Sequence, residues 1–289
     1  MTAATNSGGS GHPIAGDITR ALDALPPLPA VAMKVMQVAQ DPKSSATDLA
    51  MVVSADPGLS ARILRVVNSA AYRRAKEVTS VQQALVVLGF VQARNIAISS
   101  AITSAYTPDS LNGLFRISAF WRHSLAVGFR SADIAARGRR LDVPSAFTAG
   151  ILHNMGRLAM FYADPAGLDQ AVALAIGQDR ALDEVERELL GYDHAELGGL
   201  LAEKWKLPLE IREAVAQHHT HGATESSLAA VVAAADEFCV AQGIFPGYVI
   251  PPSEAREVVL PDEVSRLLRQ VDTLMELVAG ASVGVRMVA

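Results

Sequence analysis

The residues of this sequence most suited to chemistry are its histidines. Five of the seven fall within or at the ends of stretches with helical periodicity: His123, His153, His194, His218 and His219. Imidazole is a common ligand of divalent transition metals, and a carboxylate often completes such a site by adding negative charge. Asp236, in the stretch AAVVAAADEF, is the matching carboxylate. Two interpretations follow: a metal-dependent hydrolytic centre, or core histidines that are each satisfied by a hydrogen bond.

The stretch AGILHNMGRLAM, residues 149–160, decides between them only in part. Its apolar residues recur at the spacing of a buried helix, yet His153 and Asn154 stand side by side in its middle. If Asn154 were an aspartate, the pair would look like two metal ligands. The stretch is therefore compatible with a working metal site, with a disarmed one, and with a polar patch in a core.

The elements that must position these residues are helices. Nearly every segment has a 3.6-residue period, and strand-like alternation is rare, so we expect an all-α fold. Residues 143–165, between two prolines, are expected to form one helix that carries His153 near its middle. The first half has several helix-capping signals: Ser45 with Asp48, Asp56 before Pro57, Ser80, and Gly89 at a helix end.

The chain divides into a tail and two helical units. Residues 1–17 are small and rich in Gly and Ser, so disorder is expected there. A small helical unit should span residues 18–110, and a larger one residues 111–289, with the boundary in YTPDSLNG. Four prolines in IFPGYVIPPSEAREVVLP predict a loop, and a last helix is expected at about 262–280.

Composition restricts the class of function. Half of the 289 residues are hydrophobic and the net charge is −5, which makes non-specific nucleic-acid binding an unfavoured role. The single cysteine, Cys239, cannot form an internal disulfide or a cysteine-based zinc site. We find no signal peptide and expect no transmembrane helix and no membrane partner, so a cytoplasmic location is expected.

Long ordered motifs resemble those of HDOD-domain proteins, a bacterial signalling relative of the HD superfamily of metal-dependent phosphohydrolases. The resemblance covers residues 22–240. In the first half it is carried by LPPLPAVAMKVM, DPKSSATDLAMVVSADPGLSARILRVVNSAAY and SVQQALVVLGFVQARNIAIS, and in the second by WRHS, GILHNMGR, GYDHAELGGLLAEKWKLPLEI, AVAQHH and AAADEF. It implies a small N-terminal helical bundle packed on a larger HD-like bundle, and a non-enzymatic output or regulatory role.

The resemblance also assigns places to the candidate ligands. Metal-ligand places of HD enzymes would fall on His123, His153, Asn154 and Asp236, and further places of the cyclic-dinucleotide phosphodiesterase branch on His194, His218 and His219. The Gly-Tyr-Pro signature of that branch is missing, and Thr220 stands where a Glu often follows the paired histidines.

Asn154 is the departure that matters for chemistry. In the enzymes that position bridges two cations, whereas an amide offers one neutral oxygen and an NH₂ group that a cation repels. Unit charges 4 Å apart interact by about 4 kcal/mol at an effective dielectric of 20, so the loss should weaken metal binding on the order of a thousandfold or more. We therefore expect no catalytic residues and no cofactor, with a single divalent metal on His123, His153 and Asp236 as the remaining alternative.

The resulting expectation is a non-enzymatic regulatory module that binds an unidentified signalling protein or a small regulatory ligand. Two alternatives stay open: a metal-dependent phosphohydrolase or phosphodiesterase, and a sensor that binds a nucleotide or cyclic dinucleotide without turnover. For the sensor, Arg157 is expected to share a helix face with His153, four residues earlier, and to bind phosphate together with His123 and His194.

Overall fold

The computed structural model describes residues 15–72, 76–106, 113–138, 141–220, 227–248 and 262–279. Within these ranges the regular structure is helical, apart from a single antiparallel β-bridge between Phe115 and Tyr248. The expected all-α fold is confirmed. One continuous apolar core runs through the whole assembly of helices.

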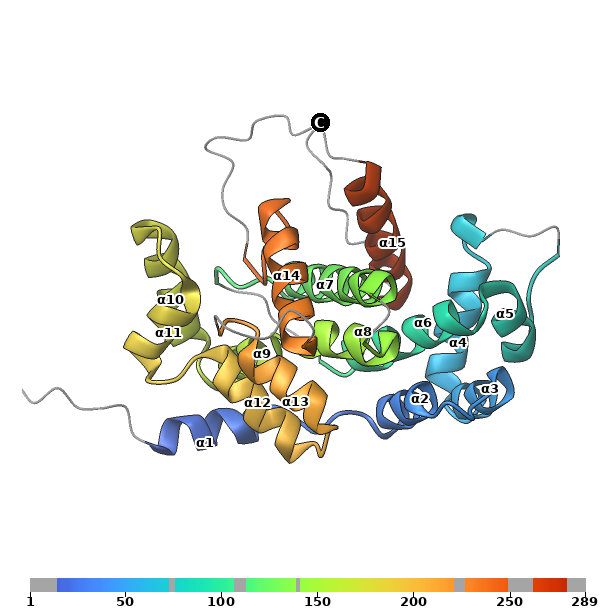
Figure 1. Ribbon diagram of the computed structural model, residues 1–289, viewed down its shortest axis with the longest axis horizontal. Coiled ribbons are helices and arrows are strands. Elements are labelled where there is room, and N and C mark those ends of the chain that lie inside the picture. The colour runs from blue at the N-terminus through green and yellow to red at the C-terminus, as the bar shows by residue number, and fades with distance from the viewer. Residues whose placement is uncertain are drawn as a thin grey trace, which may run out of the picture.

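The N-terminal helical bundle lies at the right of Figure 1. It consists of α2 (Ala30–Gln40), α3 (Ala46–Ser54), α4 (Pro57–Val67), the short 3₁₀ helix η1 (Ala70–Tyr72), α5 (Val81–Leu88) and α6 (Phe90–Thr103). The predicted caps are confirmed: Ser45 and Asp48 form a capping box, Asp56 accepts from the Leu59 amide and Ser80 from the Gln83 amide. Gly89 ends α5 with φ of +75°, a backbone conformation that residues other than glycine rarely adopt.

The larger bundle contains the remaining helices after α6. These are α7 (Ile117–Gly138), α8 (Val143–Leu152), α9 (Met155–Ala163), α10 (Pro165–Gln178), α11 (Leu182–Leu190), α12 (His194–Lys204), α13 (Leu209–Gln217), α14 (Leu228–Ala241) and α15 (Asp262–Ala279). The long helix α7 is central and packs against α8, α14 and α15 (Figure 1). Because α15 also packs against α4 and α6, it ties the two bundles together.

Helix α1 (Ala15–Ala24) packs mainly against α9 and α12 of the larger bundle, although the sequence places most of it in the N-terminal unit. The ammonium of Lys204 anchors it by donating to the Leu22 carbonyl at 2.9 Å and to the Asp23 carboxylate at 2.7 Å. Residues 15–17, for which disorder was expected, belong to this helix. The rest of that tail, residues 1–14, lies outside the described residues, as does most of the expected loop at 249–261.

The prediction of a single helix over residues 143–165 is wrong, because the helix breaks at His153 and Asn154 into α8 and α9. Two close approaches explain the break. On α8, a Cβ added to Gly150 would come within 2.7 Å of the Gly128 Cα atom on α7. On α9, a Cβ on Gly156 would overlap the backbone of α12. Helix α8 is therefore packed against α7 and helix α9 against α12, and the bend between them allows both contacts to form.

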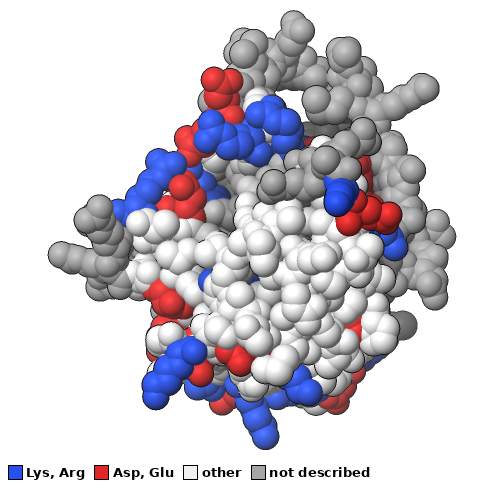
Figure 2. Space-filling view, turned by 90° about the vertical axis from the view of Figure 1, so that its right-hand side faces the viewer, with Lys and Arg blue, Asp and Glu red and all other residues white. Residues whose placement is uncertain are grey.

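Figure 2 looks onto the end of the molecule formed by the N-terminal bundle, and the middle of this face is almost free of charged side chains. Three large apolar side chains on helices of this bundle are exposed: Met51 on α3 by 60%, Val86 on α5 by 85% and Val91 on α6 by 53%. Helix α5 packs against both α3 and α6.

Among the described residues, no single helix combines the length and the apolar character that a membrane span requires. Helices α5 and α6 meet these requirements only when taken together, and they are bent by 118° relative to each other. In the fold, α6 is buried along nearly its whole length, from Ala93 to Thr103, which explains its apolar composition.

Candidate metal centre

Three predicted ligands converge in a first cluster: His123 from α7, His153 at the end of α8 and Asp236 from α14. The two histidine Nε2 atoms lie 3.4 Å apart, and the Asp236 Oδ1 atom lies 3.0 Å from the Nε2 of His123 and 3.8 Å from that of His153. Zinc–ligand bonds of about 2.0–2.1 Å place tetrahedral ligands roughly 3.3–3.4 Å apart. The three atoms are therefore spaced as one face of a tetrahedral cation site.

Backbone carbonyls orient both rings of this cluster. The Nδ1 of His123 lies 2.7 Å from the Ile244 carbonyl oxygen, and the Nδ1 of His153 lies 2.7 Å from that of Gly150. Because a carbonyl only accepts, each Nδ1 carries the proton and donates it, which leaves the Nε2 lone pairs directed toward Asp236. A ligand histidine whose other nitrogen donates to a carbonyl is the usual arrangement around a protein-bound metal.

The ionisation states in the first cluster also suit a cation. Burial alone would raise the pKa of Asp236, but the proximity of the His123 and His153 rings holds this pKa well below its ordinary value. Burial lowers the pKa of His153, and Asp236 offsets part of that effect. An ionised carboxylate beside a neutral imidazole is the state that metal binding requires.

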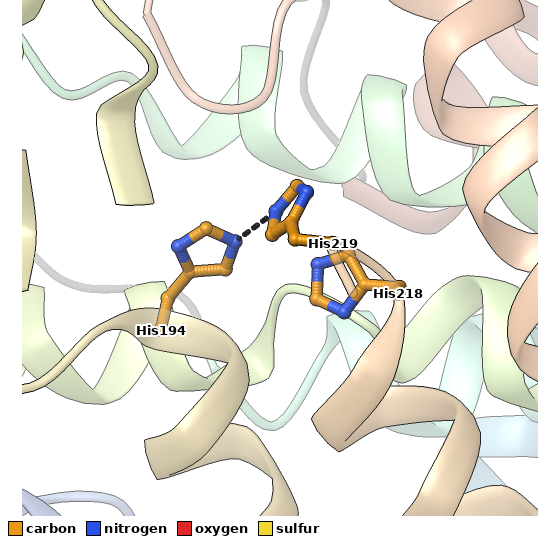
Figure 3. Close-up of side chains that lie close together, drawn as sticks. All are labelled: His194, His218 and His219. Carbon is orange, nitrogen blue, oxygen red and sulfur yellow. Dashed lines mark hydrogen bonds between the residues drawn. The ribbon is translucent and has the colours of Figure 1, made fainter. Parts of the chain in front are cut away.

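A second cluster brings together His194 at the start of α12 with His218 and His219 at the end of α13 (Figure 3). The Nε2 atoms of His194 and His219 lie 2.9 Å apart. The Nδ1 of His218 lies 2.7 Å from the Val215 carbonyl, and its Nε2 is buried without a hydrogen-bond partner among the described residues. Burial, followed by neighbouring positive charges, lowers the pKa of His194 and of His218 well below the ordinary value.

Ring contacts connect the two clusters. The ring centroids of His153 and His218 lie 5.0 Å apart with nearly perpendicular planes, and those of His194 and His218 lie 5.4 Å apart. The structure thus gathers all five helical histidines and Asp236 into one buried centre. The resemblance to HD enzymes already separates these residues into the same two groups, and the structure adds the distances and ring contacts within and between them.

Asn154 lies at the junction of α8 and α9, next to His153. It occupies the N-cap position of α9, yet its side chain makes no capping hydrogen bond. The residue is 1% exposed, and neither amide atom has a hydrogen-bond partner among the described residues. A buried, unpaired amide costs about 1–3 kcal/mol, so this position does not serve stability.

Arg157 lies against His194, as the expected anion site requires, but it does not share a helix face with His153. The break at residues 153–154 puts it in a different helix from His153, so the expected shared face does not exist. Its Nη2 lies 3.0 Å from both ring nitrogens of His194, its Nε donates to Glu186 at 3.4 Å and its Nη1 donates to the Pro246 carbonyl at 3.2 Å. His123, the third member of the expected anion site, belongs to the first cluster instead.

Glu186 on α11 is a member of the centre that sequence reasoning missed. It is fully buried, and its Oε2 accepts from the Nδ1 of His194 at 2.5 Å and from the His194 backbone amide at 2.9 Å. Burial raises the pKa of Glu186, and Arg157 is the main opposing influence. A signal existed, because Glu186 stands with Leu182, Val185 and Leu189 on the apolar stripe of its helix, where a carboxylate is out of pattern.

A family model for the HDOD domain matches residues 25–221. The chain belongs to the HDOD family. A solved structure of a candidate signal transduction protein from Marinobacter aquaeolei VT8 is 25% identical, with a TM-score of 0.70, over 89% of this chain and 60% of that one. A candidate phosphohydrolase from Shewanella amazonensis SB2B is 29% identical, with a TM-score of 0.63, over 91% and 92%. The HDOD fold is thus related to HD-type phosphohydrolase folds.

A curated relative, an uncharacterized protein of Treponema pallidum (strain Nichols), is 22% identical over 209 residues. The match covers 71% of this chain but only 40% of that protein, so this HDOD chain corresponds to less than half of the relative's length.

The two clusters of this HDOD protein differ in how well they fit the metals of HD enzymes. The first cluster fits one divalent cation, since its donors, tautomers and carboxylate charge are all appropriate. The second has no carboxylate among its three histidines and holds the guanidinium of Arg157 against one of them. Asn154 is neutral and supplies no negative charge that two cations could share. A paired-metal centre therefore does not fit these residues.

Proposed function

We propose that this HDOD chain is a non-enzymatic regulatory module that acts by binding a partner protein. The observation that carries the proposal is Asn154, a neutral, buried and unpaired amide at the position next to His153. A dinuclear hydrolytic centre needs an anion shared by its two cations, and an amide does not supply one.

Burial of the centre gives independent support. The side chains of His123, His153 and His194 have no exposed surface, and Asp236 is 8% exposed. A hydrolase must let a phosphoryl group reach the cation that such side chains hold, and these side chains have almost no exposed surface. This arrangement favours a structural role for the centre in holding α7, α8, α12, α13 and α14 together.

The partner-binding part of the proposal is supported by the face in Figure 2. The middle of that face has few charges, and Met51, Val86 and Val91 on helices of the same bundle are exposed, which suits a protein contact better than a nucleotide. The small-ligand version is less favoured, because all three nitrogens of Arg157 already have partners within the fold.

A metal-dependent phosphohydrolase is the second candidate, and the spacing of His123, His153 and Asp236 is the observation in its favour. A divalent cation held there would supply Lewis-acid chemistry toward a phosphoryl group. In that case His123 and His153 would bind through Nε2, while the carbonyls of Ile244 and Gly150 would keep both rings in place.

The two candidates are separated by metal content and hydrolysis. The purified protein, supplied with Mn²⁺, Fe²⁺ or Zn²⁺, would be assayed with bis(p-nitrophenyl) phosphate and with a cyclic dinucleotide. We expect no turnover above the protein-free rate. The matched variants are Asn154→Asp, which restores the carboxylate, and Asn154→Ser, which does not. Hydrolysis by the unaltered protein that a chelator abolishes would contradict the proposal.

A further inference from the structure

The guanidinium of Arg157 is buried inside the second cluster. The residue is 2% exposed, and each of its three nitrogens has a partner on a different element: Glu186 on α11, His194 on α12 and Pro246 in the loop after α14. A solvent-facing or loosely held arginine would not be anchored in this way. The side chain has a fixed position, and its positive charge is part of the interior.

The loop that supplies the Pro246 carbonyl to Arg157 also contacts the first cluster. The loop after α14 supplies the Pro246 carbonyl to Arg157 and, two residues earlier, the Ile244 carbonyl to His123. The same loop makes the β-bridge from Tyr248 to Phe115. One short segment therefore orients a ligand in the first cluster and fixes the guanidinium in the second.

The position of the charge conflicts with a cation at the second cluster. A metal bound to the Nε2 of His194 at about 2.0–2.1 Å would lie within roughly 5 Å of the Arg157 Nη2, which is 3.0 Å from that Nε2. The three histidines bring no negative charge to offset the repulsion. Glu186 is already engaged by the guanidinium and by the Nδ1 of His194.

We infer that Arg157 is a built-in cation that takes the place of a metal in the second cluster, so that His194, His218 and His219 bind none while it is present. Glu186 is its counter-ion, and the pair keeps the cluster electrically balanced without a metal. The inference rests on the proposed non-enzymatic function. It adds an explanation of how the centre keeps its histidines without forming a dinuclear site.

The test is the Co²⁺ stoichiometry of the full chain, measured by equilibrium dialysis and by the visible absorption of tetrahedral Co²⁺. The informative variant is the double substitution Arg157→Leu with Glu186→Gln, which removes both charges and leaves an amide oxygen to accept from His194. We expect it to bind one equivalent more than the unaltered protein. Arg157→Lys, which keeps the charge, should bind the same number as the unaltered protein.

A second comparison does not depend on the folding of the double variant. His219 is only half-buried, and His219→Ala in the otherwise unaltered chain should leave the Co²⁺ stoichiometry unchanged. A fall by one equivalent in His219→Ala, or no gain in a folded double variant, would overturn the inference. Two bound cations without hydrolysis would defeat this inference alone, whereas hydrolysis with one cation would defeat only the proposed function.

Discussion

The Nε2 atoms of His123 and His153 face each other at 3.4 Å with the Asp236 carboxylate beside them. Both Nδ1 protons are directed away, into backbone carbonyls. Helices α7, α8 and α14 thus present three acceptor atoms to one point. This relationship forms a face that can accept a cation. The difference between this first cluster and the second cluster, which holds Arg157, can be tested by substitution.

Removing the Asn154 amide should stabilise the protein. Asn154→Leu eliminates two buried polar atoms that have no hydrogen-bond partner among the described residues, so we expect the free energy of unfolding to rise by about 1 kcal/mol. Urea denaturation measures the change. The matched control is Asn95→Leu, which should destabilise, because buried Asn95 accepts from Arg94 at 2.9 and 3.0 Å. Equal effects from the two variants would contradict the prediction.

Breaking the Arg157–Glu186 pair should cost more than removing it. Glu186→Gln alone leaves a buried guanidinium without its counter-ion, and we expect a loss of roughly 3–5 kcal/mol in the free energy of unfolding. The double variant with Arg157→Leu should recover part of this loss. A double-mutant cycle in urea supplies the coupling, and additive losses would show that the two side chains do not act as a pair.

Stability should fall as the pH falls below about 6.5. The folded-state pKa values of His153, His194 and His218 are lowered, with burial as the largest cause, so below 6.5 the unfolded chain binds protons that the folded chain does not. Each such histidine contributes a slope of up to about 1.4 kcal/mol per pH unit. Denaturant titrations at pH 7.5, 6.5 and 5.5 measure it. His218→Gln should reduce the slope by up to about 1.4 kcal/mol per pH unit, the contribution of one proton. An unchanged slope would argue against a buried neutral His218.

The approach of α9 to α12 should depend on Gly156. A Cβ there overlaps the His194 backbone, so Gly156→Ala should destabilise by at least about 1–3 kcal/mol, as overpacking of a core does. Gly177 in α10 is the control, since a Cβ there meets nothing within 4 Å. Gly177→Ala should be neutral or stabilising by about 0.5–1 kcal/mol, in line with helix propensity. Thermal unfolding of both variants by circular dichroism provides the comparison.

Features that depend on near neighbours in the chain could be predicted from the sequence. The Ser45–Asp48 capping box, the Asp56 and Ser80 caps and the Gly89 helix end all involve residues one to four positions apart. Helical periodicity predicted the all-α fold, and the histidines with Asp236 were recognisable by residue type. These predictions succeed because the partners of each group are local, or because imidazole and carboxylate have few other roles in an apolar segment.

The break at His153 and Asn154, the contacts between the two clusters and the roles of Glu186 and Arg157 were decided only by the tertiary structure. Each depends on groups from distant helices, such as the packing of α9 on α12 or the Pro246 carbonyl that anchors Arg157. Backbone carbonyls have no signature in a sequence, and the direction of a side chain is set by the neighbour against which its helix packs. The sequence therefore determined which groups are available for chemistry, and the packing of helices determined which of them meet.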